Sequence, residues 1–216
     1  MCITRKRDNI KFICVVSVLP NDSKEEFFMK TQKMSTQTLV LTAVLTAMVI
    51  VLQFMGAFVK FGPFSISLVL VPIVIGAATC GYKTGAWLGF IFGAVVLISG
   101  DAAAFMAVNP FGTVVTVLAK GTLCGLLSGI VYELLRKFNS ILAVIAAAVV
   151  CPLVNTGIFL LGCLAFFMPT ITEWAGSEAV GHYMIFVLVG ANFLVELAVN
   201  IVLSPIIVRL INIRNK

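Results

Sequence analysis

Six apolar stretches follow one another along the chain from residue 37 onward, separated by short breaks that contain glycine, proline or charged residues. A helix that crosses the hydrocarbon core of a bilayer needs roughly 17 to 25 predominantly apolar residues, and each stretch is about that long. The predicted spans cover residues 37–55, 64–81, 83–99, 113–135, 141–166 and 183–210. The pattern therefore predicts an all-α integral membrane protein, folded as a compact six-helix transmembrane bundle.

Glycine recurs every fourth residue in two parts of this pattern. The two runs are Gly81, Gly85, Gly89 and Gly93, and then Gly121, Gly125 and Gly129. Glycine weakens a helix in water, but in a membrane helix a row of glycines lets another backbone approach closely. We expect these rows to be packing faces inside the bundle.

The composition agrees with a membrane protein. Hydrophobic residues make up 61% of the 216 residues and charged residues only 11%, and the mean hydropathy is +1.12. A soluble domain of this length is far more polar. We expect one membrane domain over residues 34–216, located in the cell membrane.

Lysine and arginine are distributed unevenly around the predicted spans. One set of segments holds Arg5, Lys6, Arg7, Lys11, Lys24, Lys30, Lys33, Lys83, Arg136, Lys137, Arg209, Arg214 and Lys216. The loops on the opposite side hold Lys60, with Asp101, Glu173 and Glu178. Basic residues stay on the cytoplasmic side of a membrane, so both termini are predicted to be cytoplasmic. This topology accounts for the net charge of +6 without a nucleic-acid partner.

Residues 1–33 differ from the rest of the chain. The apolar run from Ile10 to Leu19 is interrupted by Lys11 and is too short to span a membrane, and no convincing cleavage site follows it. Met29 and Met34 lie just before the first span. We expect a cytoplasmic N-terminal extension that is either disordered or upstream of the true start.

Few ionisable residues lie at membrane depth, where each needs a partner, a wet cavity or a ligand. Lys120 and Glu196 are the two most deeply placed. A rise of about 1.5 Å per residue puts Lys120 roughly 10 Å and Glu196 roughly 20 Å below the outer helix ends. Asn155 and Asn192 fall between those depths.

Helical spacing groups these residues into two polar stripes. Thr113, Thr116 and Lys120 share one face of their span. On the last span, one helix face likewise carries Asn192, Glu196 and Asn200. Facing stripes would form a cavity open to the outside, for which the candidate ligand contacts are Asn109, Lys120, Asn155, Asn192 and Glu196. Alternatively, Lys120 and Glu196 pair with each other and the asparagines only join helices.

The outer loops contain candidate covers for such a cavity. Residues 100–112 combine Asp101, small residues, aromatics and an Asn-Pro turn. Asn109 either lies at the cavity mouth or caps the following helix. The connection 56–63 is either a second cover or an interfacial anchor.

Motifs of catalysis and metal binding are absent from the sequence. There is no P-loop, no HExxH and no paired histidine, and the six cysteines form no CxxC pair. Ser128 and His182 would lie about a bilayer apart, which disfavours a Ser/His protease. We predict no enzyme activity, no metal and no cofactor.

The first span carries a small-residue face, Ala43 and Ala47, suited to close contact with another helix. Together with the glycine-rich later spans, it resembles the substrate-binding S components of energy-coupling factor (ECF) vitamin transporters. The similar local stretches are Phe61-Gly62-Pro63-Phe64-Ser65-Ile66, Gly76-Ala77-Ala78, Gly81, Gly85 to Gly93, and Asn109-Pro110-Phe111-Gly112-Thr113. The resemblance covers about residues 36–212.

This resemblance implies a subunit that captures a vitamin outside and docks on a membrane T component driven by two cytoplasmic ATPases. Ala43 and Ala47 match the alanine motif that docks on the T component, although Leu39 and Val51 replace further small residues. Lys120 would attract a carboxylate or phosphate-like group, and Asn109, Asn155 and Asn192 would orient hydroxyl or amide groups. Glu196 would hold Lys120 in place or bind a donor on the ligand.

Two ligand types fit these groups. A hydroxylated, amide-bearing anion such as pantothenate needs no large stacking surface. Riboflavin, folate or thiamin-like ligands need aromatic neighbours, which Phe105, Phe111, Trp174 and Tyr183 could provide. The competing functions are a structural or assembly membrane subunit without a ligand, and a self-sufficient channel or carrier, although no internal repeat is visible.

Overall fold

The computed structural model of the protein describes residues 36–58, 60–61, 64–65, 68–176 and 179–214. The predicted extension 1–33 lies outside the described residues. Nearly all of the described chain is helical. The long elements are α1 (Thr36–Phe58), α2 (Leu70–Cys80), α3 (Tyr82–Ser99), α5 (Pro110–Leu135), α6 (Ser140–Phe166) and α9 (Ala191–Arg214). The short ones are β1 (Lys60–Phe61), β2 (Phe64–Ser65), α4 (Ala103–Val108), α7 (Met168–Ala175), α8 (Val180–His182) and the π-helix η1 (Tyr183–Gly190).

Four helices of the described chain are long and apolar enough to cross a membrane, namely α1, α3, α5 and α6. Each begins and ends within a few residues of a predicted span. The apolar helix α2 has 11 residues, which gives a length of only about 16 Å. The protein is therefore an all-helical membrane bundle, and the count of six spans stays a prediction.

The predicted span 64–81 is wrong at its start, because α2 begins at Leu70. Phe64 and Ser65 instead form β2, which pairs antiparallel with β1. The sequence Phe64-Ser65-Ile66-Ser67-Leu68 alternates apolar and polar residues with a period of two, which favours a strand over a helix. The span was predicted from the apolar content of this segment, and apolar content alone does not distinguish a strand from a helix.

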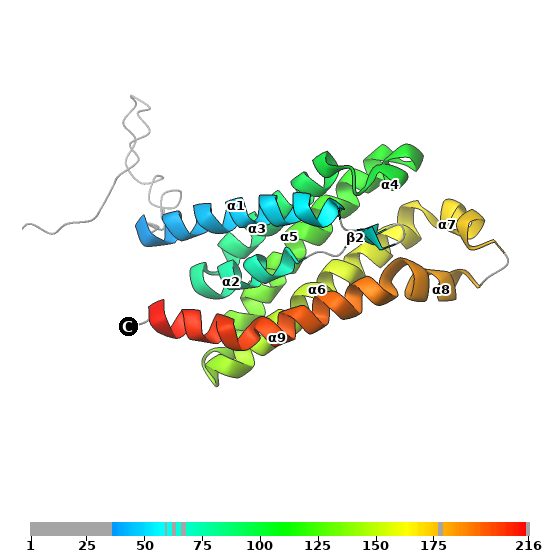
Figure 1. Cartoon of the computed structure of the whole chain (residues 1–216). Coiled ribbons are helices and arrows are strands. Elements are labelled where there is room, and N and C mark those ends of the chain that lie inside the picture. Colours follow the sequence, from blue (N-terminus) through cyan, green and yellow to red (C-terminus); the bar gives the residue numbers. More distant parts are fainter. Residues whose placement is uncertain (1–35, 59, 62–63, 66–67, 177–178, 215–216) are drawn as a thin grey trace, which may run out of the picture.

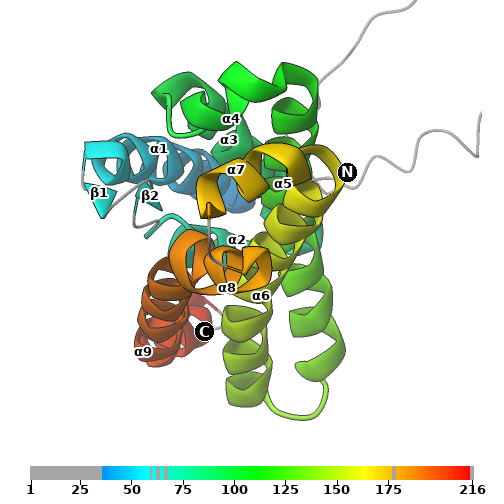
Figure 2. The ribbon, with the colours of Figure 1, turned by 90° about the vertical axis from the view of Figure 1, so that its right-hand side faces the viewer.

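Helix α2 lies at the centre of the bundle. It contacts α1, α3, α5, α6 and α9, and Figure 2 shows it surrounded by them in the end-on view. Leu70, Ile73, Val74 and Ala77 have no exposed surface. A short helix with apolar residues all round is stable when neighbours enclose it.

The two glycine rows pack against each other, as their spacing predicts. A Cβ atom on Gly89 would collide with the backbone oxygen of Gly121, and one on Gly85 would collide with that of Gly125. A Cβ atom on Gly121 or Gly125 would likewise collide with the backbone oxygen of its partner glycine on α3. The backbones of α3 and α5 are therefore in direct contact. This contact fixes the position of α5, whose N-terminal half carries Lys120.

The short elements gather at one end of the bundle. Figure 1 shows α4, α7, α8 and β2 at this end, and the start of α1, the turn between α5 and α6 and the end of α9 at the other. A small cluster of Phe105, Cys163, Phe167, Ile171 and Met184 packs beneath α4 and α7. The main core lies between the long helices.

Candidate functional site

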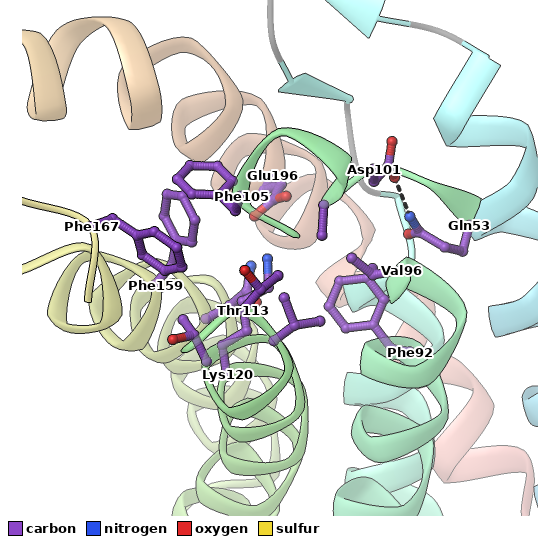
Figure 3. A pocket seen from close by; sticks show the side chains of 14 residues that line it. Gln53, Phe92, Val96, Asp101, Phe105, Thr113, Lys120, Phe159, Phe167 and Glu196 are labelled. Carbon is purple, nitrogen blue, oxygen red and sulfur yellow. Dashed lines mark hydrogen bonds between the residues drawn. The ribbon is translucent and has the colours of Figure 1, made fainter. Parts of the chain in front are cut away.

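A cavity lies between the helices at the end that carries α4 and α7 (Figure 3). About 660 Å³ of empty space lies at this site, a volume that includes open solvent. Its lining comes from α1, α3, the α3–α4 turn, α4, α5, α6 and α9. The lining residues are Gln53, Phe92, Val96, Asp101, Ala102, Phe105, Thr113, Thr116, Val117, Lys120, Asn155, Phe159, Phe167 and Glu196.

Lys120, on α5, places its side-chain ammonium group in this cavity. Its Nζ lies 5.9 Å from the centre of the Phe92 ring and 5.2 Å from that of Phe159. Thr113 and Thr116 line the cavity from the same helix face, as the predicted stripe requires. A cation between aromatic rings gains roughly 0.5 to 2 kcal/mol, which offsets only part of its desolvation.

Two further polar side chains of the lining are almost completely buried. Asn155 is 6% exposed and Thr116 is 5% exposed. Among the described residues, Asn155 Oδ1 and Thr116 Oγ1 have no hydrogen-bond partner. A buried polar atom without a partner costs about 1 to 3 kcal/mol. These atoms are therefore ready to bind a molecule that supplies the missing hydrogen bonds.

Glu196 enters the cavity from α9 with only 2% of its surface exposed. One turn further along, the Asn200 side-chain amide donates to the Glu196 backbone oxygen at 2.9 Å. Figure 3 shows the Glu196 carboxylate above Lys120 at the same cavity. The two polar stripes thus face the same space.

A second carboxylate lies on the side of the cavity nearest α1. Gln53 of α1, which is 1% exposed, donates from Nε2 to Asp101 Oδ2 at 2.5 Å. Asp101 lies in the turn between α3 and α4, next to Gly100 in the left-handed conformation. This hydrogen bond connects α1 to the α3–α4 turn at the cavity wall (Figure 3).

Aromatic side chains cover the remaining side. The Phe105 ring of α4 makes edge contacts with Phe159, Phe167 and Trp174, with ring centres 5.6, 5.1 and 5.6 Å apart. Three helical segments, α4, α6 and α7, are thereby joined over one wall of the cavity. Phe105 and Trp174 were among the aromatic neighbours expected from the sequence.

A family model of the ECF transporter substrate-specific component matches residues 37–208. The chain belongs to this family. This confirms the resemblance drawn from the sequence, and it makes the protein a substrate-binding S component of an ECF transporter and a multi-pass cell-membrane protein. Such a component works with a T component, ATPases and a small-molecule substrate. A comparison with curated proteins gave no match.

The cavity of this S component contains three of the five predicted ligand contacts, namely Lys120, Asn155 and Glu196. Asn109 is outside the described lining: it caps α5, with its side-chain Oδ1 accepting from the Gly112 amide at 2.9 Å. The Asn192 side chain lies outside the described side chains. Asn109 and Asn192 as ligand contacts stay predictions.

Several residues that line the cavity of this S component were not predicted from the sequence. Gln53 is the one polar side chain between Met48 and Met55, and a lone amide in an apolar span is a feature that could have identified it. Phe92 and Phe159 gave no such indication, because the chain has 17 phenylalanines.

Helix α1 of the S component has two different faces. Leu45, Val49 and Gln53 point inward and are 3%, 0% and 1% exposed. Ala43 and Ala47 are exposed on another face. The described residues contain no group of three or more His, Cys, Asp or Glu side chains that could hold a metal ion.

Proposed function

We propose that this S component captures a vitamin or related micronutrient from outside the cell and delivers it to a shared ATP-driven transport module. The observation that carries the proposal is a cavity that combines the Lys120 ammonium group with the buried Asn155 oxygen, which has no hydrogen-bond partner within the described part of the chain. Such a set of polar groups costs stability unless a ligand compensates for it.

The distribution of charge supports binding from the outside. The cavity lies at the α4 and α7 end, whereas the exposed residues Lys83, Arg136, Lys137 and Arg209 belong to the ends of α3, α5 and α9 or the turn after α5. Figure 1 places these helix ends at the opposite end of the bundle. The proposed topology is six spans with both termini cytoplasmic, so that the cavity opens outward.

In this proposal, Lys120 pairs with an anionic group of the ligand, because a charge-assisted hydrogen bond compensates for its burial. Asn155 accepts a hydrogen bond from the ligand through Oδ1 and donates through its amide group. Glu196 orients Lys120 or accepts from a ligand donor. Asn109, at the cavity mouth, and Asn192 are further proposed ligand contacts.

A hydroxylated, amide-bearing anion such as pantothenate fits this combination of one cation and several hydrogen-bonding groups. The cavity also has aromatic walls from Phe92, Phe105 and Phe159, so larger ring-containing vitamins belong in any ligand test.

Docking on the T component is assigned to the exposed face of α1 around Ala43 and Ala47. Small side chains let a partner helix approach the α1 backbone closely. The inward face of the same helix is occupied by core contacts and Gln53. Partner and ligand would therefore use different faces of one helix.

The test is purification in mild detergent, followed by mass spectrometry of extracted small molecules and thermal-shift measurements with a vitamin panel. We expect one compound at roughly equal molar amount, or one vitamin that raises the melting temperature by ligand linkage. Protein without a bound compound and without any thermal shift would contradict the proposal and favour an assembly subunit.

A further inference from the structure

The Thr116 side chain of α5 lies against the backbone of α6. A Cβ atom on Gly162 would collide with both Cγ2 and Oγ1 of Thr116, so the glycine provides the space that the threonine side chain occupies. Thr116 is 5% exposed and lines the cavity. Close packing of this kind holds a side chain in place. The Thr116 hydroxyl therefore has a fixed position at the wall between α5 and α6.

The Thr116 hydroxyl is not used by its own helix. A threonine within a helix commonly donates to the backbone oxygen four residues earlier. In this protein, bonds of this kind are made by Thr42, Thr46, Thr84 and Thr113. Thr116 Oγ1, by contrast, has no hydrogen-bond partner within the described residues. Valine has nearly the same shape and no hydroxyl to satisfy, so packing against Gly162 does not by itself require a threonine.

A second oxygen of this kind lies on the facing helix. Asn155 of α6 is 6% exposed and lines the cavity, and its Oδ1 has no partner in the part of the chain that the structure describes. Phe159, one turn further along α6, has its ring centre 5.2 Å from Lys120 Nζ. Figure 3 shows Lys120 and Phe159 reaching the same space from the two helices.

The two oxygens lie on either side of Lys120 along this wall. The consecutive helices α5 and α6 run in opposite directions (Figure 1). Thr116 is one turn before Lys120 on α5, toward the end of the bundle that carries α4 and α7. Asn155 is one turn before Phe159 on α6, away from that end. One turn corresponds to about 5.4 Å, so a ligand group bound at Lys120 is within a few bonds of both oxygens.

We infer that Thr116 and Asn155 are specificity-determining residues that flank the site of the ligand's anionic group at Lys120. They select a ligand with a hydroxyl or amide N–H group within a few bonds of that anionic group. Asn155 Oδ1 accepts from this donor, and the Thr116 hydroxyl bonds to a neighbouring polar atom of the ligand. An acid without such a donor leaves the Asn155 oxygen unsatisfied, which lowers its affinity. The inference rests on the proposed function, since it concerns the ligand of the same cavity.

The first experiment measures dissociation constants of the wild type by calorimetry for three groups of vitamins. Pantothenate and folate carry an amide N–H group close to a carboxylate. Lipoate, nicotinate and biotin carry a carboxylate without a nearby donor, and riboflavin and thiamin carry no anionic group. We expect a member of the first group to bind at least about 10-fold more tightly than every member of the other two, because a site built around hydrogen-bonding groups rejects ligands that leave them unpaired.

The second experiment separates the Thr116 hydroxyl from the shape of the side chain. Thr116→Val keeps the contact with Gly162 and removes the hydroxyl. We expect it to weaken binding of the same vitamin about 3- to 10-fold, the range of a neutral hydrogen bond, without a lower melting temperature. Thr116→Ser keeps the hydroxyl and removes a methyl group. It should bind within about 2-fold of the wild type and melt at a lower temperature.

Thr84→Val is the matched control for these variants. Thr84 is also 5% exposed, but it lies outside the described cavity lining and its hydroxyl donates to the Cys80 backbone oxygen at 3.4 Å. The same chemical change should therefore leave the dissociation constant of the vitamin unchanged.

The outcomes separate the two proposals. If the wild type binds none of the vitamins, the proposed function is contradicted, and the roles of Thr116 and Asn155 are lost with it. Tightest binding of a vitamin from the second or third group keeps vitamin capture and overturns only the specificity role, and this measurement needs no variant. The role of Thr116 is also overturned if Thr116→Val binds as tightly as Thr84→Val, or if Thr116→Ser loses as much affinity as Thr116→Val.

Discussion

Burial of the Lys120 ammonium group costs desolvation energy, which aromatic rings and the carboxylates of the same cavity offset. The ring centres of Phe92 and Phe159 are 5.9 and 5.2 Å from Lys120 Nζ, and a cation–π contact contributes roughly 0.5 to 2 kcal/mol. Hydrogen bonds to an anion are stronger and shorter than neutral ones. An anionic ligand would add a hydrogen bond of this kind to the contacts that Lys120 already makes.

Replacing Lys120 should consequently weaken ligand binding without unfolding the bundle. We expect Lys120→Gln to raise the dissociation constant of the identified ligand by about 10- to 100-fold, since a hydrogen bond to a charged group contributes about 1.5 to 3 kcal/mol. Calorimetry on purified protein measures this change. Lys83→Gln is the control, because Lys83 is exposed at the far end of α3; equal losses in both variants would remove Lys120 from the site.

Replacing Asn155 by an apolar residue should maintain or raise the stability of the protein but weaken ligand binding. Its Oδ1 is buried without a partner among the described residues, and exchanging such a group for an apolar one of similar shape is neutral or stabilising. We expect Asn155→Leu to keep or raise the melting temperature in detergent while it weakens ligand binding by about 10-fold or more. A variant that melts lower and binds normally would show that Asn155 is structural.

At the scale of elements, the contact between α3 and α5 leaves no room for a side chain at its glycines. A Cβ atom on Gly89 would collide with the Gly121 backbone oxygen, and overpacking of this kind costs about 1 to 3 kcal/mol. We expect Gly89→Ala to lower the melting temperature clearly. Gly157→Ala is the matched control, because nothing lies within 4 Å of a Cβ there; a similar decrease in both variants would contradict close backbone packing.

This element contact also shows what the sequence could and could not predict. The four-residue glycine spacing predicts a helix-packing face, because periodicity and small size together determine which side of a helix another backbone can approach. The same reasoning placed Lys120, Asn155 and Glu196 around one space, because charged and amide groups are rare in membrane helices. Phenylalanines are common there, so Phe92 and Phe159 could not be distinguished from core residues.

Two differences arose where neighbouring segments decide the structure. The residues before α2 pair as strands, since their alternating pattern and the preceding Gly62-Pro63 disfavour a helix. Asn109 caps α5 through a hydrogen bond to Gly112, and both roles considered for it begin from the same position before a helix. Sequence spacing cannot decide which role a polar side chain takes when both are within reach.

At the scale of the whole molecule, substitutions on the exposed face of α1 should affect transport but not ligand binding. We expect Ala43→Leu with Ala47→Leu to leave the dissociation constant within about 2-fold, because both alanines are exposed and outside the cavity lining. ATP-driven uptake in cells should be lost, since bulky side chains prevent close helix contact. Ala165→Leu with Ala198→Leu, at exposed sites on α6 and α9, should keep uptake; loss of ligand binding in the α1 variant would contradict the assignment.

Capture from outside requires that the α4 and α7 end of the bundle face the exterior, and this orientation can be measured directly. In a background that lacks the six native cysteines, Glu173→Cys on α7 and Lys137→Cys after α5 introduce exposed thiols at opposite ends. We expect a membrane-impermeant maleimide to label Glu173→Cys in intact cells and Lys137→Cys only after permeabilisation. The reverse pattern would open the cavity to the cytoplasm, and a carboxylate-lined, cation-containing site on that side could not collect a nutrient from the medium.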